Sequence, residues 1–268
     1  MVNEIYFKKT EMDGEVHRIA NESTDEFLSY ILCFPKTSCS LYEKRLLLLK
    51  KSGFDYIVET GKNILGYKII GKGYSSIIVL AHNKFYGYGA LKLRRLDSRR
   101  SSLGYEGMIL DYLDKTLLVP QLYLWSNEFI FMEYLDPQKC ISIDKVITQS
   151  LIRKDRKRTM KLLKKVILAL YFIDKLNIDH GELNRPYDHL YICKGEHVKI
   201  IDWESSGYRK PHNLTMFMSF LLYRYNHREE LVNLLGLNRN QIIKLLKKYK
   251  KTLSIKDISP LIKSLEQP

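Results

Sequence analysis

The sequence has no apolar run long enough to cross a membrane. Its longest runs, such as Val166 to Ile173, hold about eight residues, whereas a spanning helix needs about 20. The opening MVNEIYFKKTEMDGEV lacks the apolar core of a signal peptide. We therefore expect a cytoplasmic protein with no membrane partner.

Cysteine is scarce, and no two cysteines form a C-x-x-C pair. In a chain of 268 residues this pattern is typical of reduced, mostly buried thiols of a cytosolic protein. The four are Cys33, Cys39, Cys140 and Cys193. Internal repeats and low-complexity tracts are also absent, which excludes solenoid and disordered classes.

Positive charge is abundant. A formal net charge of +14 accompanies 45% hydrophobic and 28% charged residues, so the chain is globular and its partner is expected to be anionic. The charge is concentrated in two amphipathic segments, RKDRKRTMKLLKK and RNQIIKLLKKYKK. These are either solvated helix faces or docking sites for an RNA backbone or a ribonucleoprotein.

The order of patterns along the chain predicts an α+β fold. Ser23 with Glu26 and Ser40 with Glu43 fit capping boxes, so residues 1–53 are expected to hold a lead and two helices. Short runs rich in Ile, Val and Tyr then predict a five-strand antiparallel sheet with one inserted helix, up to a hinge near residues 136–139. Helical periodicity follows. Two lobes suggest a cleft that binds a ligand.

A glycine-rich turn lies in IIGKGYSSIIVL. Gly71 and Gly73 would let backbone amides approach a phosphate, although an ordinary hairpin turn explains them equally well. No G-x-x-x-x-G-K-[ST] motif is present, and a strand rather than a helix follows the turn. These features exclude a Walker A loop and a dinucleotide fingerprint.

Charged residues in three further segments are candidates for the site. Lys92 in GALKLRR lies within an apolar strand, where it faces either solvent or a buried anion. Glu106 in the following helix is its expected partner, with Asp111 as an alternative. HGELNRPYDHLYI supplies Glu182, and IIDWESSG supplies Asp202 at a strand end.

This series of motifs resembles the protein-kinase-like superfamily over about residues 64–250. The closest similarity is to the small atypical kinases of the RIO family and to the kinase subunit of the KEOPS complex. More narrowly, KLRRLDSRRSS, HGELNRP and IIDWESSG look like a group of archaeal predicted serine/threonine kinases. The resemblance implies a bilobal fold, with a helical extension at 1–53, a small β-rich N-lobe at 54–136 and a compact helical C-lobe at 137–268.

The resemblance also implies roles for individual residues. Glu182 replaces the catalytic aspartate, Asp202 holds Mg²⁺ or Mn²⁺, and Lys92 binds the phosphates of ATP. The position of the metal-binding asparagine is open between Asn184, His189 and Asp188, while His180 is expected to brace the loop. The expected nucleotide-binding residues are Gly71, Gly73, Ser75, Ser76, Ile78, Ala90, Lys92, Glu106, Met132, Glu133 and Leu135.

The implied activity is ATP-dependent transfer of a phosphoryl group to a serine or threonine of a protein substrate. An ATPase switch in an RNA-containing or tRNA-modifying assembly is an alternative, as is a non-catalytic pseudokinase scaffold. A phosphotransferase of the aminoglycoside type would normally need a large helical insertion. Only 66 residues follow Asp202, so we expect neither that insertion nor a long activation segment.

Overall fold

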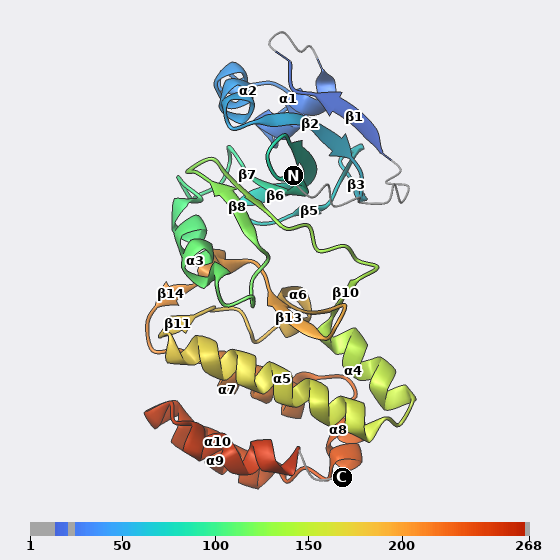
Figure 1. Cartoon of the computed structure of the whole chain (residues 1–268), viewed down its shortest axis with the longest axis vertical. Helices are drawn as coiled ribbons and strands as arrows, with labels where there is room; N and C mark the ends of the chain where they lie inside the picture. Colours follow the sequence, from blue (N-terminus) through green and yellow to red (C-terminus); the bar gives the residue numbers. More distant parts are fainter. Residues whose placement is uncertain (1–13, 21–24, 266–268) are drawn as a thin grey trace, which may run out of the picture. The chain divides into compact units, whose positions relative to one another are not determined.

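The computed structural model describes residues 14–20 and 25–265 (Figure 1). They form an α+β protein, as predicted, with an antiparallel sheet. The chain divides into two compact units, Met1–Met108 with Gln121–Tyr134 and Ile109–Pro120 with Leu135–Pro268. The division at 1–53, 54–136 and 137–268 stays a prediction. Within the described ranges, no helix has both the length and the apolar character that a membrane span requires.

The first unit is built on a sheet of seven strands rather than the predicted five. The strand order is β1-β2-β6-β7-β9-β8, and β5 pairs with β6 beside this path. The prediction missed β1, which adds an antiparallel edge strand to β2. The strands are β1 Glu15–Arg18, β2 Phe54–Glu59, β5 Gly71–Lys72, β6 Ser76–Asn83, β7 Gly87–Arg94, β8 Leu122–Trp125 and β9 Phe129–Met132.

The run ILGYKII, predicted as one strand, is interrupted by a turn. β3 (Lys62–Ile64) and β4 (Tyr67–Ile69) form a separate two-stranded hairpin. Leu65 and Gly66 both have positive φ, 54° and 97°, as a tight two-residue hairpin loop requires. The Asn63 side chain accepts a hydrogen bond from the Gly66 amide at 3.1 Å and closes the turn.

Two helices lie within residues 1–53, as predicted, but they follow β1 and their caps differ from the prediction. α1 (Glu26–Cys33) begins after Asp25, whose carboxylate accepts the Leu28 amide. Ser23 lies outside the described residues. α2 (Tyr42–Lys51) follows Leu41 with no side-chain cap, so Ser40 does not cap it. Phe27, Leu28 and Ile31 of α1 are buried in the core that includes the sheet residues Ile57, Val79 and Leu91.

A buried arginine fixes α2 to the sheet. The Arg45 guanidinium donates to the Leu32 carbonyl at 2.6 Å, to the Arg94 carbonyl at 2.7 Å and to Glu128, which also pairs with Arg94. Burial raises the pKa of Glu128, but hydrogen bonds from the two arginines outweigh burial and leave that pKa below its usual value. These contacts link residues up to 83 positions apart.

The second unit is mainly helical. Its longest helix, α5 (Arg156–Lys175), buries Leu163, Val166, Leu170 and Ile173 along one face, so the 3.6-residue periodicity correctly predicted this helix. α3 (Gly104–Asp114) crosses the boundary between the units along the chain. The other helices are α4 Ile143–Ile152, α6 Pro186–His189, α7 Asn213–Ser219, α8 Arg228–Leu235, α9 Arg239–Thr252 and α10 Ile255–Ser264.

Two small sheets position the loops of this unit. β10 (Cys140–Ser142), β12 (Leu190–Cys193) and β13 (His197–Ile200) form one antiparallel sheet. β11 (Ile178–Asp179) pairs with β14 (Gly207–Tyr208) in the other. The segment HGELNRP therefore lies between β11 and β12, and IIDWESSG begins at the end of β13.

The expectation of four reduced cysteines is wrong in this structure. Cys33 and Cys39 are joined with an S–S distance of 2.08 Å, and Cys140 and Cys193 with one of 1.99 Å. The second bond joins residues that lie opposite each other in β10 and β12. Disulfides occur in secreted proteins and also inside hyperthermophilic cells, so the bonds leave the expected cytoplasmic location a prediction.

Candidate functional site

The glycine-rich turn joins β5 to β6 in the first unit. The Gly73 amide donates to the Ser76 carbonyl at 2.8 Å and closes the turn. A Cβ atom at Gly71 would meet nothing nearer than 3.9 Å, and one at Gly73 nothing nearer than 3.5 Å. Neither glycine has positive φ. The fold therefore has room for a side chain at both positions, so neither packing nor backbone conformation requires glycine here.

Polar contacts hold this turn in place. Arg95 donates to the Gly73 carbonyl at 3.0 Å, pairs with Asp97 at 2.6 Å and lies over the Phe34 ring. Ser75 and Ser76 are both buried, and the Ser76 hydroxyl has no hydrogen-bond partner within the described part of the chain. A buried hydroxyl of this kind is an available hydrogen-bonding group beside the turn.

Lys92 and Glu106 form a buried ion pair. The Lys92 ammonium lies 2.7 Å from Glu106 Oε1, and the two side chains are 3% and 4% exposed. Lys92 is in β7 between Ile78 of β6 and Ile130 of β9, and Glu106 is in the first turn of α3. The structure thus brings together the predicted pair and leaves the alternative, Asp111, exposed.

The remaining predicted nucleotide-binding residues lie on β6, on β7, at the end of β9 and directly after it. Ala90 is opposite Met132 in the pairing of β7 with β9. The Glu133 amide donates to the Gln121 carbonyl at 2.8 Å, and the Glu133 carboxylate accepts the Gln121 amide. Leu135 is the first residue of the second unit after this segment.

His180 braces the loop of the second unit. Its Nε2 lies 2.9 Å from the Ile201 carbonyl, and its Nδ1 lies 3.4 Å from the Glu182 amide. The carbonyl can only accept and the amide can only donate, so these contacts define a neutral ring with its proton on Nε2. Burial lowers the pKa of His180 to about 4, so the ring stays neutral at physiological pH.

Glu182, His189 and Asp202 gather in the second unit. One ligand atom from each lies within 4.8 Å of the others. Glu182 Oε1 accepts the Ser205 hydroxyl, and its Oε2 lies 3.3 Å from His189 Nε2. Asp202 has φ 64°, a left-handed conformation that aspartate tolerates better than most residues. The Glu182 side chain is still 40% exposed, so it is accessible to a substrate.

The His189 ring is better suited to donate a hydrogen bond than to bind a metal ion. Its Nδ1 is buried and has no partner among residues 14–20 and 25–265. A proton on Nδ1 would be a buried, unsatisfied donor that costs about 1–3 kcal/mol. The favoured tautomer therefore carries its proton on Nε2, directed at Glu182. Metal-ligating histidines normally have their second nitrogen held by a partner, which His189 lacks in the described structure.

Asn184 is exposed and lines a cavity of about 440 Å³ that is also lined by Asp144, Arg185, Tyr187 and Arg224. Asp188 is likewise exposed. Of the two candidates that are histidine or aspartate, the described structure places His189, and not Asp188, in the cluster with Glu182 and Asp202.

Sequence reasoning missed the residues that support this loop. Asn213 accepts the His180 amide at 2.8 Å and donates to the Ile178 carbonyl at 2.7 Å. Asp174 accepts the Asn213 amide and the Tyr249 hydroxyl, and burial raises its pKa to about 6. The partners are 33 to 75 residues apart, so no local pattern could reveal them.

The comparisons with known proteins do not identify a relative. No family model matches this chain, and the curated proteins contain no match to it.

Proposed function

We propose that this protein is an atypical ATP-dependent serine/threonine kinase with a bilobal protein-kinase-like fold. The main support is the buried ion pair between Lys92, in the second strand after the glycine-rich turn, and Glu106 of α3. A lysine ammonium is a hydrogen-bond donor of the kind that binds the phosphates of ATP in protein kinases. The motif resemblance over residues 64–250 supports the same activity. The protein binds ATP and phosphorylates a hydroxyl of a protein substrate.

Glu182 is the group that receives the proton of the acceptor hydroxyl. Ser205 and His189 contact its two oxygens from either side, which fixes the orientation of the carboxylate. Its partial exposure leaves room for a hydroxyl within hydrogen-bond reach. Glutamate has one more methylene than the usual aspartate, and these two contacts position the longer side chain.

Asp202 and Glu182 fit a divalent cation, because carboxylate oxygens are the ligands that Mg²⁺ and Mn²⁺ prefer. Asp202 would hold the ion, with Glu182 as the neighbouring oxygen donor, and His189 would remain a donor to Glu182. When bound, the ion would neutralise charge on the nucleotide phosphates.

The test uses purified protein, Mg²⁺ and ATP labelled in the γ-phosphate, with casein as an added acceptor. We expect labelled serine or threonine on the protein or on casein. Asp202→Asn should abolish labelling. Glu182→Gln should keep ATP binding and reduce labelling at least 100-fold, within the usual range for a lost general base. Glu182→Asp should retain part of it.

Asp188→Asn is the matched control, because Asp188 is an exposed acid on the same loop outside the cluster. It should label as well as the wild type. Release of free labelled phosphate without protein labelling would favour the ATPase switch. ATP binding with neither product would favour the pseudokinase, and full activity in Glu182→Ala would contradict the assignment of Glu182.

A further inference from the structure

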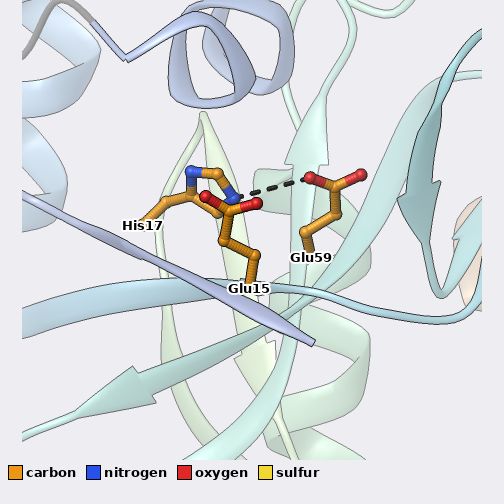
Figure 2. A group of neighbouring side chains, drawn as sticks. All are labelled: Glu15, His17 and Glu59. Carbon is orange, nitrogen blue, oxygen red and sulfur yellow. Dashed lines mark ion pairs between the residues drawn. The ribbon is translucent and has the colours of Figure 1, made fainter. Parts of the chain in front are cut away.

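Three side chains with metal-binding chemistry converge at the edge of the large sheet, far in sequence from the kinase motifs. Glu15 and His17 lie two residues apart on β1, so they project from one face. Glu59 at the end of β2 is directly opposite Glu15 in the register. Figure 2 shows the two carboxylates and the imidazole facing a common point, and one ligand atom of each lies within 4.8 Å of the others.

The imidazole of His17 is prepared as a ligand. The residue is only 7% exposed, and its Nδ1 lies 2.7 Å from Asp25 Oδ2. Asp25 Oδ1 accepts the Leu28 amide at the start of α1, so Asp25 is the acceptor and Nδ1 carries a proton. Nε2 is buried, directed at the two glutamates, and without a hydrogen-bond partner within the described chain. A carboxylate behind a histidine is the usual support of a metal-ligating imidazole.

We propose that Glu15, His17 and Glu59 bind a divalent transition-metal ion, with Zn²⁺ the preferred occupant. The site belongs to the first unit and does not depend on the kinase activity.

The separation of the ligand atoms fits an ion better than a hydrogen bond. His17 Nε2 lies 3.5 Å from Glu59 Oε2, longer than the N–H···O distance of about 2.9 Å. Two ligands of a tetrahedral zinc ion, each about 2.05 Å from the metal, lie about 3.3 Å apart. Glu59 is already oriented, because its Oε1 accepts the Lys68 amide at 2.9 Å, and the exposed Glu15 can move to complete the set.

The negative charges of Glu15 and Glu59 also favour a bound cation. Like charges placed directly opposite each other on paired strands destabilise a sheet, and Glu15 faces Glu59 in this way. A cation between them removes that repulsion. One imidazole and two carboxylates suit Zn²⁺, Mn²⁺ or Fe²⁺ better than Ca²⁺ or Mg²⁺, which take oxygen ligands. Among the three, zinc binds most tightly.

A bound ion would attach the edge strand to its neighbour. β1 and β2 would be joined through Glu15, His17 and Glu59, and the His17–Asp25 contact would extend the link to the cap of α1. The ion therefore has a structural role. It would stabilise the first unit, since a ligand that binds only the folded state raises the melting temperature.

The experiment measures Zn²⁺ stoichiometry and affinity by chelator competition, together with the melting temperature. All proteins carry Glu182→Gln and Asp202→Asn, which remove the other acidic cluster. In that background we expect one Zn²⁺ per chain and a higher melting temperature with Zn²⁺. Adding Glu59→Gln should weaken binding at least tenfold and remove the thermal shift. Asp25→Asn keeps a good helix cap but should weaken binding 10- to 100-fold, as expected for lost support behind a ligand.

His82→Gln is the matched control. His82 pairs with Asp55 at 3.0 Å on the same sheet. Among the described residues, it belongs to none of the side-chain clusters that could hold a metal ion. The substitution should therefore leave zinc binding unchanged. Equal zinc affinity with and without Glu59→Gln would overturn the proposal. So would a background protein that binds no Zn²⁺, since the His17–Asp25 contact would then serve only the packing of β1 against α1.

Discussion

At the scale of single residues, the buried Lys92–Glu106 pair is a candidate for phosphate binding and also affects the stability of the fold. Both charges are withdrawn from water, so removing one deprives the other of the partner that lies 2.7 Å away. Breaking a buried pair in this way costs about 3–5 kcal/mol, whereas replacing both partners is often neutral. A loss of ATP binding in a single variant would therefore not distinguish a defect in the binding site from unfolding of the protein.

We expect Lys92→Met to lower the free energy of unfolding by about 3 kcal/mol, and Lys92→Met with Glu106→Leu to recover most of that loss. Urea denaturation of the wild type, both single variants and the double variant forms a double-mutant cycle. A single variant as stable as the double variant would show that the pair is solvated.

His180 should make stability depend on pH. Its folded pKa of about 4 is below the unfolded value of 6.5, so between these values the unfolded chain binds more protons and stability falls as pH falls. The shift corresponds to about 3 kcal/mol. Asp174 acts in the opposite sense, because its raised pKa of about 6 means that its contribution is lost as pH rises from 3.8 to 6.

In the wild type, His180 and Asp174 change the free energy of unfolding in opposite directions as the pH is lowered. In Asp174→Asn only the histidine contribution remains, so unfolding free energy should decrease steeply as the pH is lowered from 6.5 to 4. Urea titrations at several pH values measure this slope. If the unfolding free energy of Asp174→Asn did not decrease over this range, His180 would be protonated in the folded state.

Residues near each other in sequence were predictable, and distant partners were not. Glu106 could be assigned to Lys92 because a strand and the next helix connect them over 14 positions. The support of His180 by Asn213, and of Asn213 by Asp174, crosses 33 and 39 positions. His189 was predicted from the sequence as a candidate metal ligand. Its role as a hydrogen-bond donor follows only from the structure, where its Nδ1 has no partner among the described residues.

At the scale of elements, the β5–β6 turn allows a test of ligand approach separate from stability. A Cβ at Gly73 would have room, and alanine reduces the entropy of the unfolded chain, so Gly73→Ala should change stability by less than about 1 kcal/mol. It should nevertheless weaken ATP binding severalfold, because the methyl group lies where a phosphate approaches the backbone. Calorimetric titration with ATP measures this. Unchanged affinity would mean an ordinary hairpin turn.

The disulfide between β10 and β12 should contribute more stability than the one after α1. It closes a loop with a sequence separation of 53, against 6 for Cys33–Cys39. In the chain-entropy treatment these loops correspond to about 4 and about 2 kcal/mol. Unfolding of Cys140→Ser/Cys193→Ser and of Cys33→Ser/Cys39→Ser checks the order. Four free thiols in unfolded, unreduced protein would contradict both bonds.

Elements with regular apolar periodicity were predicted, and the edge strand β1 was not. The long helices α5 and α9 follow a 3.6-residue pattern, and β6 contains an unbroken apolar run from Ile77 to Ala81. In β1 the usual burial of apolar and polar side chains is reversed, since the apolar Val16 is 52% exposed while the polar His17 is buried. A strand that buries its histidine for contacts with Asp25 and Glu59 carries no hydrophobic signal.

At the scale of the whole molecule, part of the charge excess is used within the fold. Lys161 and Lys165 pair with Glu196 and lower its pKa to about 2, and Lys248 pairs with Asp257. The cluster from Arg153 to Arg158 contains several exposed cations before and within the first turn of α5. Binding of RNA or a ribonucleoprotein through these residues remains a prediction.

The central claim of the proposed function is that Lys92 binds the phosphates of ATP and that Asp202 holds the divalent ion. Calorimetric titration with ATP, with and without Mg²⁺, tests it in the wild type, in Asp202→Asn and in Lys92→Met/Glu106→Leu. We predict that Mg²⁺ tightens binding in the wild type and not in Asp202→Asn, and that the double variant binds weakly in both conditions. Absence of ATP binding to the wild type at millimolar concentration would contradict the account.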